Sequence, residues 1–376
     1  MTDRDCLRID LRDTPRPRGY DIVVGSGLLE TAAEFIAPLL PRPRVVIISD
    51  ENVAPLYLKT LKASLTGAGI RSDHLIVPPG EASKSFDGLG RLLEHLLALP
   101  IDRQTTLVAL GGGVVGDLTG VTASLALRGV PFIQVPTTLL AQVDSAVGGK
   151  TGVNSLAGKN LIGSFYQPIL VLSDLATLDS LPRREMQAGY AEVVKYAAIG
   201  DRSFFDWLED NGAQILNIGD RDSARMAILK SCAAKAAIVA ADERESGQRR
   251  LLNLGHTFAH AFEAAAGYGS ILHGEAVAMG LVAAFDLSER LGHCPAGETD
   301  LLHRHFRALG MAVRPGEIVD CTDWTVDQLM SLMTRDKKAS DGRVTFVLVR
   351  RLGEAFLSDA VGEDALRATL ENCLSG

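Results

Sequence analysis

Continuous apolar runs alternate with helical stretches along the first half of the chain. Residues 44–49 contain the uninterrupted β-branched run Val45 to Ile48 and predict a strand, and further apolar runs predict strands at 74–77 and 106–110. Between them, apolar residues at three- and four-residue spacing predict helices at 56–68 and 85–97. Strands that are apolar on both sides and alternate with helices form parallel sheets covered on both faces. The pattern therefore predicts an α/β fold with a parallel sheet.

The two ends of the chain carry weaker strand patterns. Residues 7–11 and 20–24 alternate apolar and polar positions around a Pro-Arg-Pro-Arg-Gly turn, which predicts a hairpin or an edge pair. Near the other end, a turn at residues 341–342 precedes a predicted strand at 344–349.

Three loops follow strands of the predicted sheet, where ligands of such sheets bind. They are residues 50–52, residues 78–84 and the loop GGGVVGD at 111–117, which precedes a helix expected to begin near Asp117. Glycines let backbone N–H groups approach a pyrophosphate, although tight strand-to-helix packing also requires them. Asp50 precedes the glycines, whereas the Rossmann acid follows them by about 20 residues. We therefore expect a nucleotide site of different topology.

A further buried strand ends near Pro136, and a glycine-rich segment with polar side chains follows it. This segment holds Asp144, Lys150, Lys159 and Asn160. Lysines on glycine-rich loops at the mouth of a sheet are suited to binding anions, although solvated surface lysines are the simpler alternative.

Histidines in the second half indicate a metal site. His256 and His260 are four residues apart in a helical pattern, so both project from one face, and His273 follows a Gly-Tyr-Gly break. With Glu192 as the best-placed carboxylate, such residues can hold a catalytic zinc ion and leave a position open for substrate. The alternative is a set of helix-face histidines paired with neighbouring side chains.

The pattern of apolar residues changes around residues 178–182, after which the chain is mainly helical and rich in alanine. We therefore predict two domains: a nucleotide-binding α/β domain at 1–180 and a mainly α-helical, metal- and substrate-binding domain at 181–376.

Composition narrows the function classes. The 376 residues carry a net charge of -8, which argues against a nucleic-acid surface. Five scattered cysteines form no Cys-x-x-Cys pair, so neither a disulfide framework nor a thiolate zinc site is indicated. The charged N-terminus and the lack of a long apolar run predict a cytoplasmic protein without a membrane segment.

Several long stretches of the chain, in one order, follow the pattern of a known family. They read PPGEASKS, GGGVVGDLTG, RGVPFIQVPTTLLAQVDSAVGGKTGVN, GKNLIGSFYQP, AEVVKY, LLNLGHTFAHAFE and HGEAVAMG. They resemble the 3-dehydroquinate synthases, which are sugar-phosphate cyclases with the glycerol-dehydrogenase-like fold. The resemblance implies conversion of 3-deoxy-D-arabino-heptulosonate 7-phosphate to 3-dehydroquinate and phosphate, in the shikimate pathway towards aromatic amino acids. It also implies NAD and zinc or cobalt, with transient oxidation, phosphate elimination, reduction, ring opening and aldol closure.

The resemblance assigns roles position by position. It places the metal ligands on Glu192, His256 and His273 and moves His260 to the substrate, whereas spacing alone would choose His256 and His260. The implied NAD contacts are Asp50, Glu81, Lys84, Gly112, Gly113, Val114, Val115, Gly116, Asp117, Thr137, Thr138, Lys150, Lys159 and Thr177. The implied substrate and catalytic contacts are Asp144, Lys150, Asn160, Lys195, Lys235, Arg249, Asn253 and His260, with Arg128 from the second copy in a homodimer and either Lys337 or Lys338 closing the site.

One departure from the family pattern and three alternatives stay open. Ala126 stands where the family usually has an aromatic residue, which puts the packing near Arg128 in question. A sister cyclase acting on sedoheptulose 7-phosphate or glucose 6-phosphate would have no substrate carboxylate to hold. A metal-dependent polyol dehydrogenase would oxidise its substrate with net reduction of NAD, and a non-catalytic protein would keep only the fold.

Overall fold

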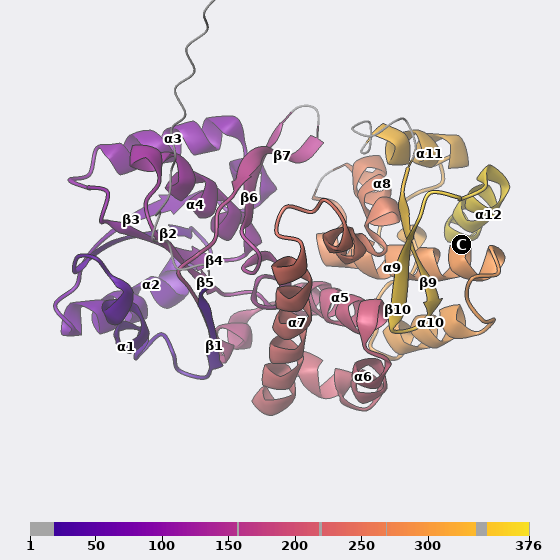
Figure 1. Ribbon diagram of the computed structural model, residues 1–376, viewed down its shortest axis with the longest axis horizontal. Helices are drawn as coiled ribbons and strands as arrows, with labels where there is room; N and C mark the ends of the chain where they lie inside the picture. The colour runs from indigo at the N-terminus through magenta and orange to yellow at the C-terminus, as the bar shows by residue number, and fades with distance from the viewer. Residues whose placement is uncertain (1–18, 156–157, 218–219, 268, 336–343, 376) are drawn as a thin grey trace, which may run out of the picture.

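The N-terminal half is built on a six-stranded sheet in which every pair is parallel (Figure 1). The structure is a computed structural model that describes residues 19–155, 158–217, 220–267, 269–335 and 344–375. In spatial order the strands are β1 (Asp21–Gly25), β8 (Leu170–Asp174), β5 (Phe132–Pro136), β4 (Thr106–Gly111), β2 (Arg44–Asp50) and β3 (Arg71–Val77).

Both faces of this sheet are covered. Val45 and Ile47 of β2 pack in one apolar cluster with α1 (Ala32–Ile36) and α2 (Ala54–Gly67). Val46 and Ile48 pack in another cluster, with α3 (Phe86–Leu97) and α4 (Gly113–Leu125). Successive strand residues point to opposite faces, so an uninterrupted apolar run is what a doubly covered sheet requires. The predicted parallel α/β sheet is confirmed.

Two strand predictions at the N-terminal side have different outcomes. Residues 7–11 lie outside the described residues. The segment 20–24 forms β1 at the edge of the sheet, where it pairs in parallel with β8.

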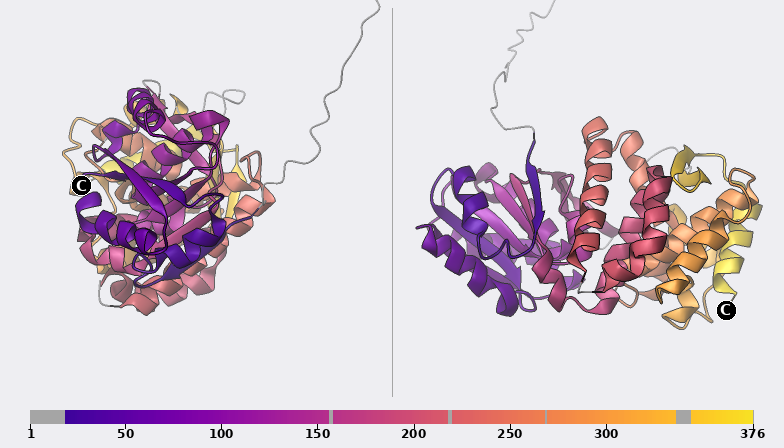
Figure 2. Two further views of the ribbon diagram at one scale, coloured as in Figure 1. Left: turned by 90° about the vertical axis from the view of Figure 1, so that its left-hand side faces the viewer. Right: turned by 90° about the horizontal axis from the view of Figure 1, so that it is seen from below.

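The C-terminal half is mainly helical, as expected (Figures 1 and 2). Its helices are α5 (Arg183–Gly200), α6 (Arg202–Leu216), α7 (Arg221–Ala241), α8 (His256–Ala266), α9 (His273–Arg290), α10 (Glu298–Ala308), α11 (Val326–Arg335) and α12 (Glu363–Leu374). The strands β9 (Phe346–Arg351) and β10 (Glu354–Ser358) form an antiparallel pair, and β9 overlaps the predicted strand at 344–349. No described helix is long and apolar enough to cross a membrane. The boundary at residue 180 stays a prediction.

The glycine-rich segment expected to be loops forms a β-hairpin instead. β6 (Lys150–Ser155) and β7 (Gly158–Phe165) pair antiparallel, and β6 packs against α4. Gly152 and Gly163 face the partner strand so closely that a Cβ on Gly163 would lie 2.1 Å from the Thr151 carbonyl oxygen. The prediction was wrong because these glycines, which usually weaken a strand, are needed here for close backbone approach.

Candidate active site

Three helices of the C-terminal half bring one carboxylate and two histidines together. Glu192 lies in the middle of α5, whereas His256 and His273 are the first residues of α8 and α9. Helix α9 begins directly against α5 because Gly274 has no side chain: a Cβ there would lie 1.9 Å from the Ala188 carbonyl oxygen. Ala188 is one turn before Glu192, so this close approach sets His273 beside the carboxylate.

The three side chains direct possible ligand atoms to one point. Glu192 Oε1 lies 3.6 Å from His256 Nε2 and 3.5 Å from His273 Nε2. Donor atoms about 2.0 Å from a tetrahedral zinc ion lie roughly 3.3 Å apart, so this spacing fits a divalent metal. Glu192 is fully buried; its Oε2 is paired with Lys195 Nζ at 2.5 Å, whereas Oε1, which faces the two histidines, has no hydrogen-bond partner among the described residues. A metal ion at this point would satisfy a buried carboxylate that is otherwise costly.

The electrostatics around the three residues also favour a cation at this point. Burial raises the pKa of Glu192, but Lys195 outweighs this effect and the pKa falls to about 2. Burial and the Lys195 ammonium lower the pKa of His256 to about 3, so its imidazole is neutral. Burial lowers the pKa of His273, but the carboxylates of Glu192 and Glu263 outweigh it and raise the pKa to about 10. The point between the carboxylates therefore favours positive charge.

His260 shares a helix face with His256, as its spacing predicts, with ring centroids 5.6 Å apart. In the described part of the chain, however, His256 groups with Glu192 and His273, whereas His260 groups with Glu263 and His273. The geometry thus favours the ligand set implied by the resemblance over the pair suggested by spacing. The assignment of ligands stays a prediction.

Asp144 is the centre of a cluster of charges beside these residues. It lies in η4 (Ala141–Ser145), a single π-helical turn that follows β5. Its carboxylate accepts hydrogen bonds from Lys235 Nζ, at 2.9 Å, and from the Tyr196 hydroxyl. Lys195 Nζ lies 3.8 Å from Asp144 and 2.5 Å from Glu192 Oε2, so it links the two clusters. Burial raises the pKa of Asp144, but Lys235 and Lys195 outweigh this effect and hold it well below its usual value.

A second carboxylate joins the two halves of the molecule at the hairpin. Glu245 Oε2 lies 2.5 Å from Lys150 Nζ, at the start of β6, and Glu245 Oε1 accepts a hydrogen bond from Asn253 Nδ2 at 3.1 Å. Glu245 has φ 60°, a left-handed conformation that non-glycine residues seldom adopt. A carboxylate of the protein thus lies beside Lys150, which the sequence predicts to bind a substrate anion.

Arg249 is fully buried in η6 (Gln248–Asn253). Its guanidinium donates hydrogen bonds to the Gly148 carbonyl oxygen, at 2.7 Å, and to the Glu243 carbonyl oxygen. Burial lowers the pKa of Arg249 against the opposing effect of nearby carboxylates. In this conformation Arg249 fixes the backbone just before β6 through its hydrogen bond to Gly148.

The three predicted loops meet at the carboxyl edge of β2, β3 and β4, which are neighbours in the sheet. Helix α4 begins at Gly113, four residues before the position expected from the sequence, and no side chain caps its first turn. The prediction was wrong because Gly113 and Gly116 belong to the helix. At Gly113 a Cβ would lie 2.9 Å from Ser145 Oγ. An uncapped helix N-terminus lined by glycines fits a pyrophosphate.

Other residues expected to contact NAD lie around this edge, and they differ in whether their polar groups already have partners within the protein. Lys84 Nζ lies 2.5 Å from Asp117, and Glu81 accepts a hydrogen bond from Asn154. Burial lowers the pKa of Lys84, but the Asp117 carboxylate outweighs it and the net pKa rises. The Thr137 hydroxyl is buried without a partner among the described residues, so it is a donor that a ligand could satisfy.

Four further NAD candidates already have partners inside the protein. Asp50 accepts hydrogen bonds from the backbone of Asn52 and Val53, and Thr138 Oγ1 accepts one from Ala141. The Thr177 hydroxyl donates to the Asp174 carbonyl oxygen. Lys159 Nζ donates to Glu263 Oε1 at 2.8 Å.

The remaining predicted residues are exposed, lie in an apolar cluster or lie outside the described chain. Asn160 is exposed on β7 with φ 57°, and Arg128 is exposed after α4 with φ 69°. Ala126 is buried in the apolar cluster of α3 and α4. Lys337 and Lys338 lie outside the described residues.

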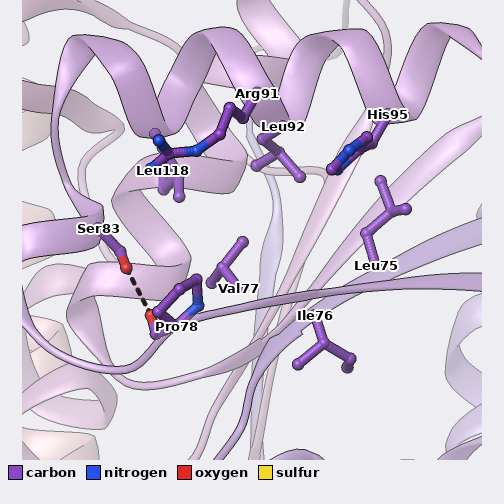
Figure 3. Close-up of a pocket in the computed structure, with 10 residues that line it drawn as sticks. Leu75, Ile76, Val77, Pro78, Ser83, Arg91, Leu92, His95 and Leu118 are labelled. Atoms are coloured by element: carbon purple, nitrogen blue, oxygen red, sulfur yellow. Dashed lines mark hydrogen bonds between the residues drawn. The ribbon is translucent and has the colours of Figure 1, made fainter.

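A small cavity of about 100 Å³ lies between β3 and α3, bordered by Pro78 and Ser83 of the predicted loop at 78–84 (Figure 3). Leu75 and Val77 of β3 point towards Leu92 and His95 of α3, Arg91 lies on α3 beside them, and Ile76 points away from the helix. No predicted site residue is among those that line it.

Sequence reasoning missed Tyr196, Glu245 and Glu263. Tyr196 directly follows Lys195 in the stretch AEVVKY, so its place in the chain could have drawn attention to it. Glu263 lies seven residues after His256, on the same face of α8, so helical spacing could have found it. Glu245 gave no such signal, because its place beside Lys150 depends on the tertiary fold.

Two family models match successive parts of the chain. The N-terminal family model of 3-dehydroquinate synthase matches residues 74–188, and the C-terminal model matches residues 189–339. The 3-dehydroquinate synthase of Rhodospirillum rubrum is 53% identical over 354 residues, which cover 94% of this chain and 92% of the relative.

Solved structures of related cyclases share the whole fold. The 2-epi-5-epi-valiolone synthase of Streptomyces hygroscopicus subsp. jinggangensis, with NAD+ and Zn2+ bound, matches with a TM-score of 0.87 at 28% identity, over 98% of this chain and 99% of that one. A 2-deoxy-scyllo-inosose synthase complexed with carbaglucose-6-phosphate, NAD+ and Co2+ matches with a TM-score of 0.83 at 26% identity, over 94% of this chain and 97% of that one. The family expected from the sequence is confirmed: this chain belongs to the 3-dehydroquinate synthase family.

Proposed function

We propose that this protein is a phosphate-eliminating lyase that converts 3-deoxy-D-arabino-heptulosonate 7-phosphate to 3-dehydroquinate and phosphate, a step of the shikimate pathway. The observation that carries the proposal is the position of the cationic cluster directly beside the candidate metal ligands, with Lys195 Nζ 2.5 Å from Glu192. A substrate with a carboxylate and a phosphate needs cations at its reacting end. The identity to the Rhodospirillum rubrum relative over almost the full chain supports the same substrate.

Glu192, His256 and His273 would hold a divalent ion, zinc or cobalt. When bound, the ion would lower the pKa of a substrate hydroxyl and polarise the carbonyl formed from it. The fully buried Glu192 gives the site one fixed negative charge, and α5 holds it against the starts of α8 and α9. His260 would face the substrate from the next turn of α8.

NAD would bind at the carboxyl edge of the sheet and would supply the transient oxidation of the substrate. The first turn of α4, residues 112–117, would hold the pyrophosphate through backbone N–H groups. Lys84 and Asp117 fix each other beside this turn, which keeps the glycines in place. The Thr137 hydroxyl would donate to the cofactor. The remaining contacts would come from Asp50, Glu81, Thr138, Lys150, Lys159 and Thr177.

The chain's own residues would bind and orient the substrate. Lys150 and Asn160 would bind the phosphate at the hairpin. The ion pair between Glu245 and Lys150 would have to break when the phosphate binds. Lys195, Lys235 and Asn253 would face the ring and the carboxylate. Asp144 would hold both Lys195 and Lys235 in place through its ionised carboxylate. Arg249 would keep the backbone before β6 in position and add positive charge to the carboxylate end.

We also propose a homodimer formed through the outer side of the hairpin. Leu161 and Ile162 are exposed on β7, and Leu125 is exposed at the end of α4. Tyr166, just after β7, donates a hydrogen bond to the Val130 carbonyl oxygen, so this apolar surface lies near Arg128. A second copy would cover it and bring Arg128 towards the partner's site.

Substrate discrimination tests the proposed function. Purified protein with NAD and zinc is assayed with 3-deoxy-D-arabino-heptulosonate 7-phosphate, sedoheptulose 7-phosphate and glucose 6-phosphate. Only the first carries a carboxylate, and leaving several buried cations without it costs several kcal/mol. We expect kcat/KM for the carboxylated sugar to exceed the others by at least about a hundredfold. Equal rates with sedoheptulose 7-phosphate would instead support the sister-cyclase function.

A further inference from the structure

Glu263 is a buried carboxylate that has no part in the proposed chemistry. It lies on α8 and is only 2% exposed. Its Oε1 accepts a hydrogen bond from Lys159 Nζ at 2.8 Å, and its Oε2 lies 3.5 Å from His273 Nδ1. A carboxylate is withdrawn from water in this way only where charged partners compensate for its desolvation.

The two ring nitrogens of His273 face two different carboxylates. Nε2 faces Glu192, and Nδ1 faces Glu263. A carboxylate beside Nδ1 favours the proton on that nitrogen, which leaves the Nε2 lone pair directed at the candidate metal position. On the other histidine, the Leu254 carbonyl oxygen lies 3.2 Å from His256 Nδ1 and so faces that ring nitrogen as Glu263 faces His273 Nδ1.

We propose that Glu263 is the positioning residue of the metal centre: it orients His273 so that Nε2 is the ligand atom, while Lys159 fixes the carboxylate from the other half of the molecule. This inference rests on the metal site of the proposed function. Lys159 belongs to β7 and Glu263 to α8, so the pair also ties the hairpin to the helix that begins with His256. Carboxylates that orient metal-binding histidines typically raise metal affinity 10–100-fold.

The structure also defines a competing role for Glu263. One ligand atom each from Glu263, His260 and His273 lies within 4.8 Å of the others, so these residues could hold an ion of their own. The two roles differ in stoichiometry. A positioning residue leaves one metal per chain, whereas a ligand role adds a second metal that disappears when Glu263 is replaced.

The experiment measures zinc affinity and stoichiometry of the metal-free full chain by competition with a chromophoric chelator, and records the absorption spectrum with Co2+. The variants are Glu263→Gln, Glu263→Asp and Lys159→Met. Glu209→Gln, on an exposed part of α6, removes the same charge away from the site and serves as the control. Denaturant unfolding of each metal-free variant shows whether it folds.

We expect Glu263→Gln to bind one zinc ion 10–100-fold more weakly and to shift the Co2+ spectrum. Glu263→Asp should lie between this variant and the wild type, and so should Lys159→Met, because the carboxylate then loses its second partner. Glu209→Gln should bind as the wild type does. If Glu263→Gln does not fold, the zinc affinity, stoichiometry and Co2+ spectrum of Glu263→Asp test the inference instead.

Two results would overturn the inference. In the first, Glu263→Gln and Glu263→Asp bind zinc as tightly as the wild type. In the second, the wild type binds two ions and Glu263→Gln binds one. A wild type that binds no zinc would instead count against the metal site of the proposed function.

Discussion

Gly274→Ala tests how the close contact between α9 and α5 builds the site. A Cβ at this position would lie 1.9 Å from the oxygen, 2.3 Å from the carbon and 2.4 Å from the Cα of Ala188. Ordinary contacts of a Cβ begin at 3.4 Å, so the two backbones must separate by about 1.5 Å. The obstacle is backbone, which cannot rotate away as a side chain can.

Two quantities should change together. Forcing a methyl group into a packed interior costs about 1–3 kcal/mol, which exceeds the gain of up to about 1 kcal/mol from replacing glycine in a helix. We therefore expect a lower free energy of unfolding in urea. Because His273 precedes Gly274, its Nε2 should also move by a large part of a metal–nitrogen bond of about 2.0 Å, and zinc affinity should fall at least about tenfold.

The measurements are urea unfolding of the metal-free protein and zinc binding by chelator competition. Gly90→Ala is the matched control, because Gly90 lies in helix α3 with nothing within 4 Å of its Cβ position. It should keep zinc affinity and be at least as stable as the wild type. If Gly274→Ala matched the wild type in both stability and zinc affinity, the steric account of the site would be refuted.

Three further predictions follow from other parts of the site and the core. His273→Ala should lose tight zinc binding, whereas His260→Ala should keep zinc and lose activity; the reverse result in metal analysis would restore the ligand pair suggested by spacing. Arg249→Ala should lower kcat/KM by about two to three orders of magnitude, roughly 3–4 kcal/mol, and a loss below tenfold in steady-state assays would remove Arg249 from the site. Burial lowers the pKa of His305 to about 4. Between pH 6.5 and 4 the unfolded state therefore binds a proton that the folded state does not, so this group should reduce stability by about 3 kcal/mol as the pH falls. In urea unfolding at several pH values, His305→Gln should lose this part of the pH dependence, and an unchanged slope would count against it.

The sheet could be predicted from the sequence because its signal is local. Within the run at 44–49, Val45 to Ile48 are apolar at every position, and both faces of β2 are indeed covered. The meeting of the three loops followed as well, since parallel strands end at one edge. Glycines misled the prediction twice, at the start of α4 and in β6–β7, because the same residue permits loops and close packing.

The site was less predictable because its contacts join distant parts of the chain. The histidine spacing located α8 correctly but could not show that α9 begins against α5, a contact that depends on Gly274 and Ala188. Glu263 follows the helical spacing but needed Lys159 and His273 nearby to be recognised. Glu245, which pairs with Lys150, has a left-handed backbone conformation that could not be predicted from the sequence.

The balance of products and cofactor tests the proposed function most directly. With 3-deoxy-D-arabino-heptulosonate 7-phosphate, zinc and NAD, inorganic phosphate, 3-dehydroquinate and NADH absorbance are followed in the same reaction. We predict one phosphate and one 3-dehydroquinate for each substrate consumed, with no net NADH over many turnovers. Accumulation of NADH in proportion to product would contradict this function and support the polyol dehydrogenase.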